Sequence, residues 1–357
     1  MTVTVRDSAF RLLRDLGLRT VFAGPAPTAS MFHDVPDDFR RVDHAHDWMA
    51  VVVAAGYAQT SHRPALVHAS GEFGVVSAVG HLLAARADRT PLIVLAAATD
   101  DDPTRGGPWS QIPSAPVTTL VAETRRRIPR RLVEAHATVV ERSDGPVVVL
   151  TPHGSGHQSV GRHQSHTLSV PARPVVDRAT GPAVDLPRVV RGDPGDRLRN
   201  VADIIRVLRG AAPADTVLVD DGRSVGTRAA SGWASTPRAL RYSSAQRLAG
   251  WEIPFALGVA LAQRDLGRNR SVLVVTTAMS LQASVQALAT ALVLALPLVV
   301  VVLDGAGCGP LARAFGAAVE TASTRAALGE AVASAWWRER PTIIGITPAG
   351  AVDASSG

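Results

Sequence analysis

The chain has 357 residues, a length typical of two or three domains, and its 46% hydrophobic and 19% charged residues suit packed cores and exclude a disordered protein. All 37 basic residues are arginine, because the sequence contains no lysine; this excludes Schiff-base, pyridoxal phosphate and Walker-type P-loop chemistry. The net charge of +6 does not predict nucleic-acid binding, since acidic residues lie among the arginines. The single cysteine, Cys308, excludes intrachain disulfides and fits a reducing, cytoplasmic location.

The first 152 residues alternate short apolar runs with amphipathic stretches of helical length. The apolar runs predict buried strands, and the stretches between them predict helices. Continuous apolar strands separated by helices indicate a doubly wound α/β domain, with a mainly parallel sheet covered on both faces. The expected strands are 20–23, 65–68, 91–95 and 147–150, and the expected helices are 48–59, 74–86 and 122–141.

The same alternation resumes near residue 200 and predicts a second doubly wound α/β domain over residues 200–348. Its most apolar stretch, 287–303, contains Pro297 and is shorter than a membrane span of about 20 residues, so no membrane segment is expected. The expected helices are 201–209, 254–264 and 284–296, and the expected strands are 216–219, 271–276 and 298–303.

Residues 153–199 separate the two domains and are rich in Ser, Gly, Pro, His and Arg, so we expect a linker there. The linker contains His153, His157, His163 and His166, but their spacing matches no standard metal site and no acidic residue or cysteine lies among them. A solvated loop is therefore favoured over a metal site. The small, polar residues 349–357 are expected to form a flexible tail.

Two sets of segments carry a resemblance to a known family. Residues 55–59 (AGYAQ), 63–67 (RPALV) and 90–94 (TPLIV) in the first domain, and residues 250–258 (GWEIPFALG) and 297–303 (PLVVVVL) in the second, form the pattern. The chain resembles the thiamine-diphosphate (ThDP)-dependent enzymes, most of all benzoylformate decarboxylase and acetolactate synthase. The resemblance implies a pyrimidine-binding domain followed by a diphosphate-binding domain. Since only a short linker lies between them, the third, middle domain of the family is expected to be absent.

The resemblance also implies candidate catalytic residues in the first domain. The family's carboxylate beside N1′ of the cofactor aligns with Asp47, whose side chain is one methylene shorter, and a misplacement of that size can cost about 100-fold in rate. Asp47 equally suits the N-cap of a helix that begins at Trp48. The family's histidine aligns with Ser70, and His68 is expected on the same face of the extended strand. His46 is a further candidate.

The resemblance places the Mg²⁺ ligands in a Gly-Asp-Gly motif and an asparagine pair. Here the first motif reads Thr-Ala-Met with Ala278 at the acidic position, and Gly305 replaces a ligating asparagine. Magnesium prefers hard oxygen ligands, so Mg²⁺ is not expected to bind, and any ThDP would bind atypically. Asp304 is a candidate for a relocated carboxylate ligand. The candidates for cofactor contacts are Gly250, Trp251, Ile253 and Arg223, whose guanidinium could clamp a diphosphate.

Two hypotheses about function remain open. In the first, the chain keeps the fold, has lost Mg²⁺–ThDP chemistry, and acts as a partner subunit or through a repurposed cleft. In the second, it is an active ThDP-dependent 2-oxo acid decarboxylase or carboligase that uses Asp47 and an atypical diphosphate site. The resemblance further implies a homo-oligomer, dimer or tetramer, and allows a hetero-partner with intact cofactor motifs. The groups available to a repurposed cleft are Asp43, His44, His46, Asp47, His68, Ser70, Glu72 and Asp304.

Overall fold

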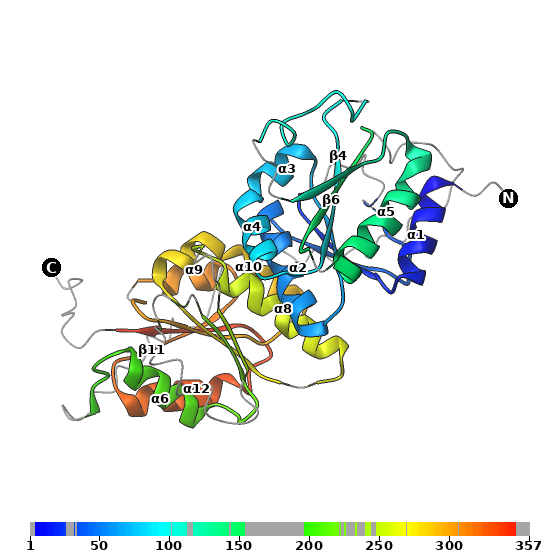
Figure 1. Cartoon of the computed structure of the whole chain (residues 1–357). Coiled ribbons are helices and arrows are strands. Elements are labelled where there is room, and N and C mark those ends of the chain that lie inside the picture. Colours follow the sequence, from blue (N-terminus) through cyan, green and yellow to red (C-terminus); the bar gives the residue numbers. More distant parts are fainter. Residues whose placement is uncertain are drawn as a thin grey trace, which may run out of the picture.

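The structure is a computed structural model of the chain. It describes residues 4–25, 32, 34–100, 102–112, 117–142, 144–153, 196–220, 222, 225, 233, 240–243, 248–268, 270–305 and 307–347. These residues form two α/β units, each built on a six-stranded sheet in which every strand pair is parallel (Figure 1). The expected pair of doubly wound α/β domains is therefore confirmed. Most of the expected linker, residues 154–195, and the expected tail lie outside the described residues.

The first sheet has the strand order β2-β1-β3-β4-β6-β5. Its four expected strands are present, and their residues are almost all buried because helices cover both faces. Two edge strands, β2 and β5, were not expected, because their polar sequences give no apolar run. The strands are β1 (Thr20–Ala23), β2 (Arg40–Asp43), β3 (Ala65–His68), β4 (Leu92–Ala97), β5 (Thr118–Val121) and β6 (Val147–Thr151).

The helices of the first unit differ from expectation in three places, the first of which is the unexpected helix α1 (Val5–Asp15). The expected helix 74–86 is two helices that meet at Ala78, and the expected helix 122–141 begins only at Ile128, after a 3₁₀ turn (Arg125–Arg127), and ends in a π turn (Thr138–Arg142). The helices are α1 (Val5–Asp15), α2 (Asp47–Ser61), α3 (Glu72–Ser77), α4 (Val79–Ala87) and α5 (Ile128–Ala137).

The second sheet has the order β11-β12-β10-β9-β7-β8. The expected helix 284–296 corresponds to α10, and a short helix, α9, which the apolar pattern did not reveal, precedes it. The strands are β7 (Val217–Asp220), β8 (Leu240–Ser243), β9 (Val272–Thr276), β10 (Val299–Val302), β11 (Ala318–Ala322) and β12 (Thr342–Ile346). The helices are α6 (Val201–Ala211), α8 (Glu252–Asp265), α9 (Ala278–Ser284), α10 (Gln286–Val293), α11 (Gly309–Ala314) and α12 (Arg325–Ala335).

Each sheet has a point where the direction of winding reverses. The chain runs from β1 outward to β2 and then returns to the other side of β1 as β3; likewise it runs from β7 to β8 and returns as β9. In open parallel sheets, ligands bind outside the carboxyl ends of the strands at such a switch point. The two places to look for a site are therefore the carboxyl ends of β1 and β3, and those of β7 and β9.

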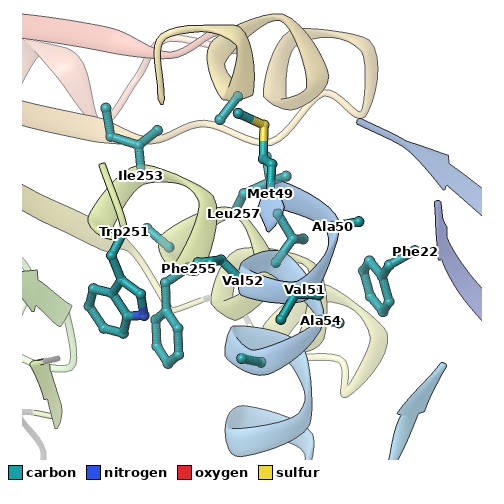
Figure 2. Packing of buried hydrophobic residues seen from close by; sticks show 14 of the residues in the cluster. Phe22, Met49, Ala50, Val51, Val52, Ala54, Trp251, Ile253, Phe255 and Leu257 are labelled. Carbon is teal, nitrogen blue, oxygen red and sulfur yellow. The ribbon is translucent and has the colours of Figure 1, made fainter. Parts of the chain in front are cut away.

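The two units meet where helices α2 and α8 cross. A Cβ on Gly56 would lie 2.1 Å from the Phe255 carbonyl oxygen, and one on Gly258 would lie 2.0 Å from the Val53 carbonyl oxygen. The two glycines therefore allow the helix backbones to touch. Around this crossing one hydrophobic cluster continues from the first unit into the second, with Met49 from α2 close to the residues of α8 (Figure 2).

An ion pair also links the two units at this junction. Asp265, the last residue of α8, accepts hydrogen bonds from the Tyr57 hydroxyl at 2.9 Å and from the Arg40 guanidinium at 3.0 Å. Burial opposes ionisation of this carboxyl group, but the Arg40 contact outweighs it and lowers the pKa of Asp265. The junction thus combines close helix packing with a partly buried ion pair.

Candidate functional site

Asp47 lies at the switch point of the first sheet. It is the first residue of α2, and the N-cap is His46, so the interpretation of Asp47 as the N-cap was wrong. Its carboxylate is only 6% exposed and points back toward the end of β3. There Oδ1 accepts the backbone N–H of Ser70 and Oδ2 accepts the Ser70 hydroxyl, each at 2.7 Å. Asp47 and Ser70, two of the candidate catalytic residues, therefore do come together.

Two glycines leave the space that this carboxylate fills. A Cβ on Gly24, just after β1, would lie 2.2 Å from Asp47 Oδ1, and a Cβ on Gly74 in α3 would lie 2.6 Å from Asp47 Cγ. Any side chain at either position would collide with the carboxylate. The Asp47 carboxylate is thus enclosed by backbone on two sides and hydrogen-bonded by Ser70 on a third.

The candidate histidines lie in other surroundings. Strand β3 ends at His68, so Ser70 lies beyond the strand and the expectation that both share one strand face was wrong. The buried His68 ring packs against Phe32 with centroids 5.4 Å apart. The exposed His46 ring stacks on Trp48 at 6.1 Å, and Trp48 stacks in turn on His81 at 4.9 Å.

His44 is a second buried histidine at this edge. Neither ring nitrogen has a hydrogen-bond partner among the described residues, and the ring is stacked near Phe22. Burial lowers the pKa of His44 to about 3. The ring is therefore neutral at physiological pH, and a role as a cationic acid or anion ligand is not supported.

The switch point of the second sheet is occupied by an ion pair that the sequence analysis missed. Asp220, at the end of β7, is fully buried, and its two oxygens accept Arg241 Nε at 2.7 Å and Nη2 at 2.8 Å. The Gly222 N–H donates a third bond to Oδ1 at 2.7 Å. A bidentate Arg pair with an added backbone donor satisfies a buried carboxylate. The signal in the sequence was an aspartate directly after an apolar run.

The residues at the implied magnesium position form a contact of their own. The Ala278 N–H, at the start of α9, donates to Asp304 Oδ1 at 2.6 Å. A Cβ on Gly305 would lie 2.5 Å from Gly345 Cα, so the backbone of strand β12 occupies the space that an asparagine side chain would need. No group of three or more His, Cys, Asp or Glu in the described ranges could hold a metal ion. These residues do not fit a Mg²⁺–diphosphate chelate.

Three of the four expected cofactor contacts of the second unit, Gly250, Trp251 and Ile253, pack against other residues of the protein. Gly250 has a positive φ of 81° and lies against Ala283 of α9, where a Cβ would be 2.9 Å from the alanine Cβ. Trp251 is buried and stacks on Phe255 with centroids 4.2 Å apart, and Ile253 is fully buried. Arg223 lies outside the described residues. As cofactor contacts these four residues remain predictions.

Burial and the nearby Asp304 raise the pKa of the Cys308 thiol, which does not favour a reactive thiolate. Among the helices that the structure describes, none is long and apolar enough to cross a membrane.

Two models of one protein family match the sequence of this chain. The N-terminal TPP-binding domain of thiamine pyrophosphate enzymes matches residues 3–111, and the C-terminal TPP-binding domain matches residues 222–310. A benzoylformate decarboxylase from Pseudomonas aeruginosa is 35% identical over 94 residues, which are 26% of this chain and 18% of that protein. The matched stretch is thus under a fifth of that relative's length.

Solved structures show the same fold at low identity. A Mycobacterium smegmatis protein classed as a thiamin diphosphate-dependent enzyme aligns with a TM-score of 0.79 and 19% identity, covering 97% of this chain and 99% of that one. Benzoylformate decarboxylase from Polynucleobacter necessarius aligns with a TM-score of 0.77 and 17% identity, with the same coverage of both chains.

Proposed function

The chain belongs to the thiamine-diphosphate-dependent enzyme superfamily, and on that premise we propose that it works without the Mg²⁺–ThDP chemistry of its relatives. It would act as a partner subunit or through its own remodelled cleft. The observation that carries this proposal is the hydrogen bond from the Ala278 N–H to Asp304. At the place where the family resemblance puts a carboxylate ligand for the metal, this chain has only a backbone donor, which its own carboxylate already occupies.

Electrostatics supports the same conclusion. A diphosphate at the carboxyl end of β9 would approach the Asp304 carboxylate, and the two negative charges would repel each other without a divalent cation between them. The nearby Arg241 guanidinium is already held by the buried Asp220. Moving it to a diphosphate would leave a buried carboxylate without its cation, which is strongly unfavourable.

The first unit supports a structural role for Asp47. Both of its oxygens accept hydrogen bonds from Ser70, so the pair fastens the start of α2 to the segment after β3. A second candidate function, an active ThDP-dependent 2-oxo acid decarboxylase or carboligase, draws support from one observation. The carboxylate still lies at the first switch point, in a space kept open by Gly24 and Gly74.

Two exposed apolar side chains, one at the carboxyl edge of each sheet, are consistent with partner binding. Phe73, in the first turn of α3, is 68% exposed, and Met279, in the first turn of α9, is 72% exposed. These exposed apolar side chains would be available to the apolar surface of a partner. A homo-oligomer, or assembly with a relative that retains its cofactor motifs, is part of the proposal.

Thermal unfolding tests the proposal. The full chain is melted with excess ThDP, once with Mg²⁺ and once with EDTA, because a ligand that binds only the folded state raises the melting temperature. We expect the same melting temperature in both samples and in buffer alone. A rise with ThDP in either sample would contradict the proposal and favour the decarboxylase or carboligase, with a typical metal site if the rise requires Mg²⁺ and an atypical one if it does not. The Asp304→Ala variant should behave like the parent chain, since it adds no metal ligand.

A further inference from the structure

A second feature of the first unit lies outside the contact between Asp47 and Ser70. The segment that follows β4 folds over the start of α3 and leaves a cavity of about 290 Å³. Its described lining includes Glu72, which the sequence analysis named as available to a repurposed cleft, and Thr99, Asp100, Asp102, Gly107 and Gln111. Since a water molecule takes about 30 Å³ of liquid, the cavity has room for a small organic molecule.

The cavity wall is held in place by Glu72. This side chain is 3% exposed; Oε1 accepts the Thr99 N–H at 3.2 Å and Oε2 accepts the Trp109 N–H at 3.1 Å. Gly107 passes so close that a Cβ there would lie 2.0 Å from Oε2. Trp109 is itself 1% exposed and donates its indole N–H to Thr119 at 2.9 Å. The segment is therefore anchored at Thr99 and at Trp109.

The charges around the cavity are unbalanced. No arginine or histidine of the described ranges forms an ion pair with Glu72, although buried carboxylates are normally matched by a cation. Asp100 and Asp102 add two more carboxylates to the lining. Their ionic partner, Arg105, stays at 3.9 and 3.6 Å with its side chain 72% exposed, so these pairs are weak.

We propose that this cavity binds a small organic cation, an ammonium or guanidinium compound. The buried Glu72 supplies a fixed negative charge at the wall, and the uncommitted lone pairs of its two oxygens can accept N–H donors. Asp100 and Asp102 supply charge at the rim, where the ligand displaces Arg105 into solvent. A metal ion is not favoured, because the described carboxylates do not converge on one point. This inference does not depend on the loss of ThDP chemistry.

A titration with matched small probes tests the proposal. Methylguanidinium and N-methylurea have nearly the same shape but differ in charge, and acetate serves as the anionic probe. They are added to the full chain while the Trp109 backbone and indole N–H signals are followed by NMR. We expect the Trp109 signals to shift on addition of methylguanidinium. The affinity for methylguanidinium should be at least about tenfold above that for N-methylurea, and high salt should weaken it. Equal binding of the charged and neutral probes, or preferential binding of acetate, would overturn the proposal.

Variants locate the binding. The double change Asp100→Asn with Asp102→Asn removes two charges while keeping an oxygen that can accept from Thr104, and should weaken methylguanidinium binding about tenfold. Asp37→Asn, an exposed acid outside the lining, is the matched control and should change nothing. Gln111→Trp fills the cavity without changing its charge and should abolish binding. Binding that survives both lining changes would contradict the assignment of the site, as would no shift of Trp109 in the parent chain.

Discussion

The carboxyl edges of the two sheets share a topology and differ in chemistry. At the first edge, a buried carboxylate, Asp47, lies at the switch point and takes both bonds from Ser70. At the second edge, the polar groups are a backbone N–H of Ala278 capped by the exposed Asp304 and the buried pair of Asp220 with Arg241. Both sheets have a switch point, but each carboxylate there accepts hydrogen bonds from other residues of the same chain.

Under the proposed function, this difference would be how a family fold loses cofactor binding while its packing stays intact. The first edge keeps a carboxylate at its switch point and adds an acid-lined cavity, so it could regain or replace a ligand with few changes. At the second edge, the backbones of Gly305 and Gly345 are in contact and leave no space for a side chain at position 305. We therefore expect substitutions at the second edge to be limited by steric fit, and those at the first edge by hydrogen bonding and charge.

The largest effect should come from restoring the implied amide ligand. Gly305→Asn places a Cβ 2.5 Å from Gly345 Cα and 3.0 Å from the Val302 carbonyl oxygen. Overpacking against backbone should lower the free energy of unfolding by about 3 kcal/mol or more, measured by urea denaturation. Gly210→Asn is the control, since a Cβ there meets nothing within 4 Å. An unchanged stability of Gly305→Asn would show that the second edge is open to a ligand.

Acid should destabilise the first unit next most strongly. All 11 histidines precede residue 167, and burial lowers the pKa of His44 to about 3 and that of His81 to about 4, against an ordinary value of 6.5. Below pH 6.5 the unfolded chain therefore binds a proton that folded His44 does not. Stability from this group is complete above pH 6.5 and falls toward pH 3 by up to about 1.4 kcal/mol per unit.

Replacing His44 tests this directly. His44→Phe should remove one buried titration and flatten the fall in stability between pH 6.5 and 4, by about 3 kcal/mol at the acid end. Urea unfolding across that pH range measures the slope. His62→Asn, at an exposed position, should leave the slope unchanged. Identical slopes for His44→Phe and the parent chain would contradict the burial of a neutral imidazole at this edge.

The contact between Asp47 and Ser70 gives an intermediate effect. Asp47→Ala removes the acceptor of two hydrogen bonds in a buried place and should cost about 2 kcal/mol, because bonds to a charged group contribute more than neutral ones. A double-mutant cycle with Ser70→Ala should show a coupling of about 1 kcal/mol, since the hydroxyl bond is lost in either single variant. Strict additivity would mean that the two side chains do not interact.

The smallest effect is expected at Asp304. Asp304→Ala removes an exposed carboxylate that caps the Ala278 N–H, which water can replace in part, so stability should fall by about 1 kcal/mol or less. The exposed Glu330→Ala is the matched control and should change stability less. A gain in stability on removing Asp304 would indicate that the carboxylate is strained there, as expected of a metal ligand without its metal.

Most of the fold could be predicted from the sequence. The elements that the prediction missed share a physical cause. Central strands such as β4 and β9 are buried on both faces and read as continuous apolar runs. Edge strands such as β2 and β8 are half exposed, with arginines in them, and give no such run. The sequence interpretation ended at residue 303 and so omitted the last strands and helices, including the buried β12.

The candidate site was predicted less completely. The family resemblance named both Asp47 and Ser70 as candidate catalytic residues, and the structure places them in contact. The partner of each carboxylate could not be predicted, since it depends on contacts between segments far apart in the chain, such as Asp304 with Ala278 and Gly305 with Gly345. The enclosure of Glu72 depends on how the segment after β4 folds, which apolar periodicity does not encode.

Calorimetric titration of the full chain with ThDP, in the presence and absence of Mg²⁺, tests the central claim most directly. The claim is that the second carboxyl edge holds no Mg²⁺–diphosphate chelate, because Asp304 occupies the Ala278 N–H and Gly345 fills the space beside Gly305. We predict no heat of binding that depends on Mg²⁺. Micromolar affinity that requires Mg²⁺ would contradict the claim and return the chain to the working enzymes of its superfamily.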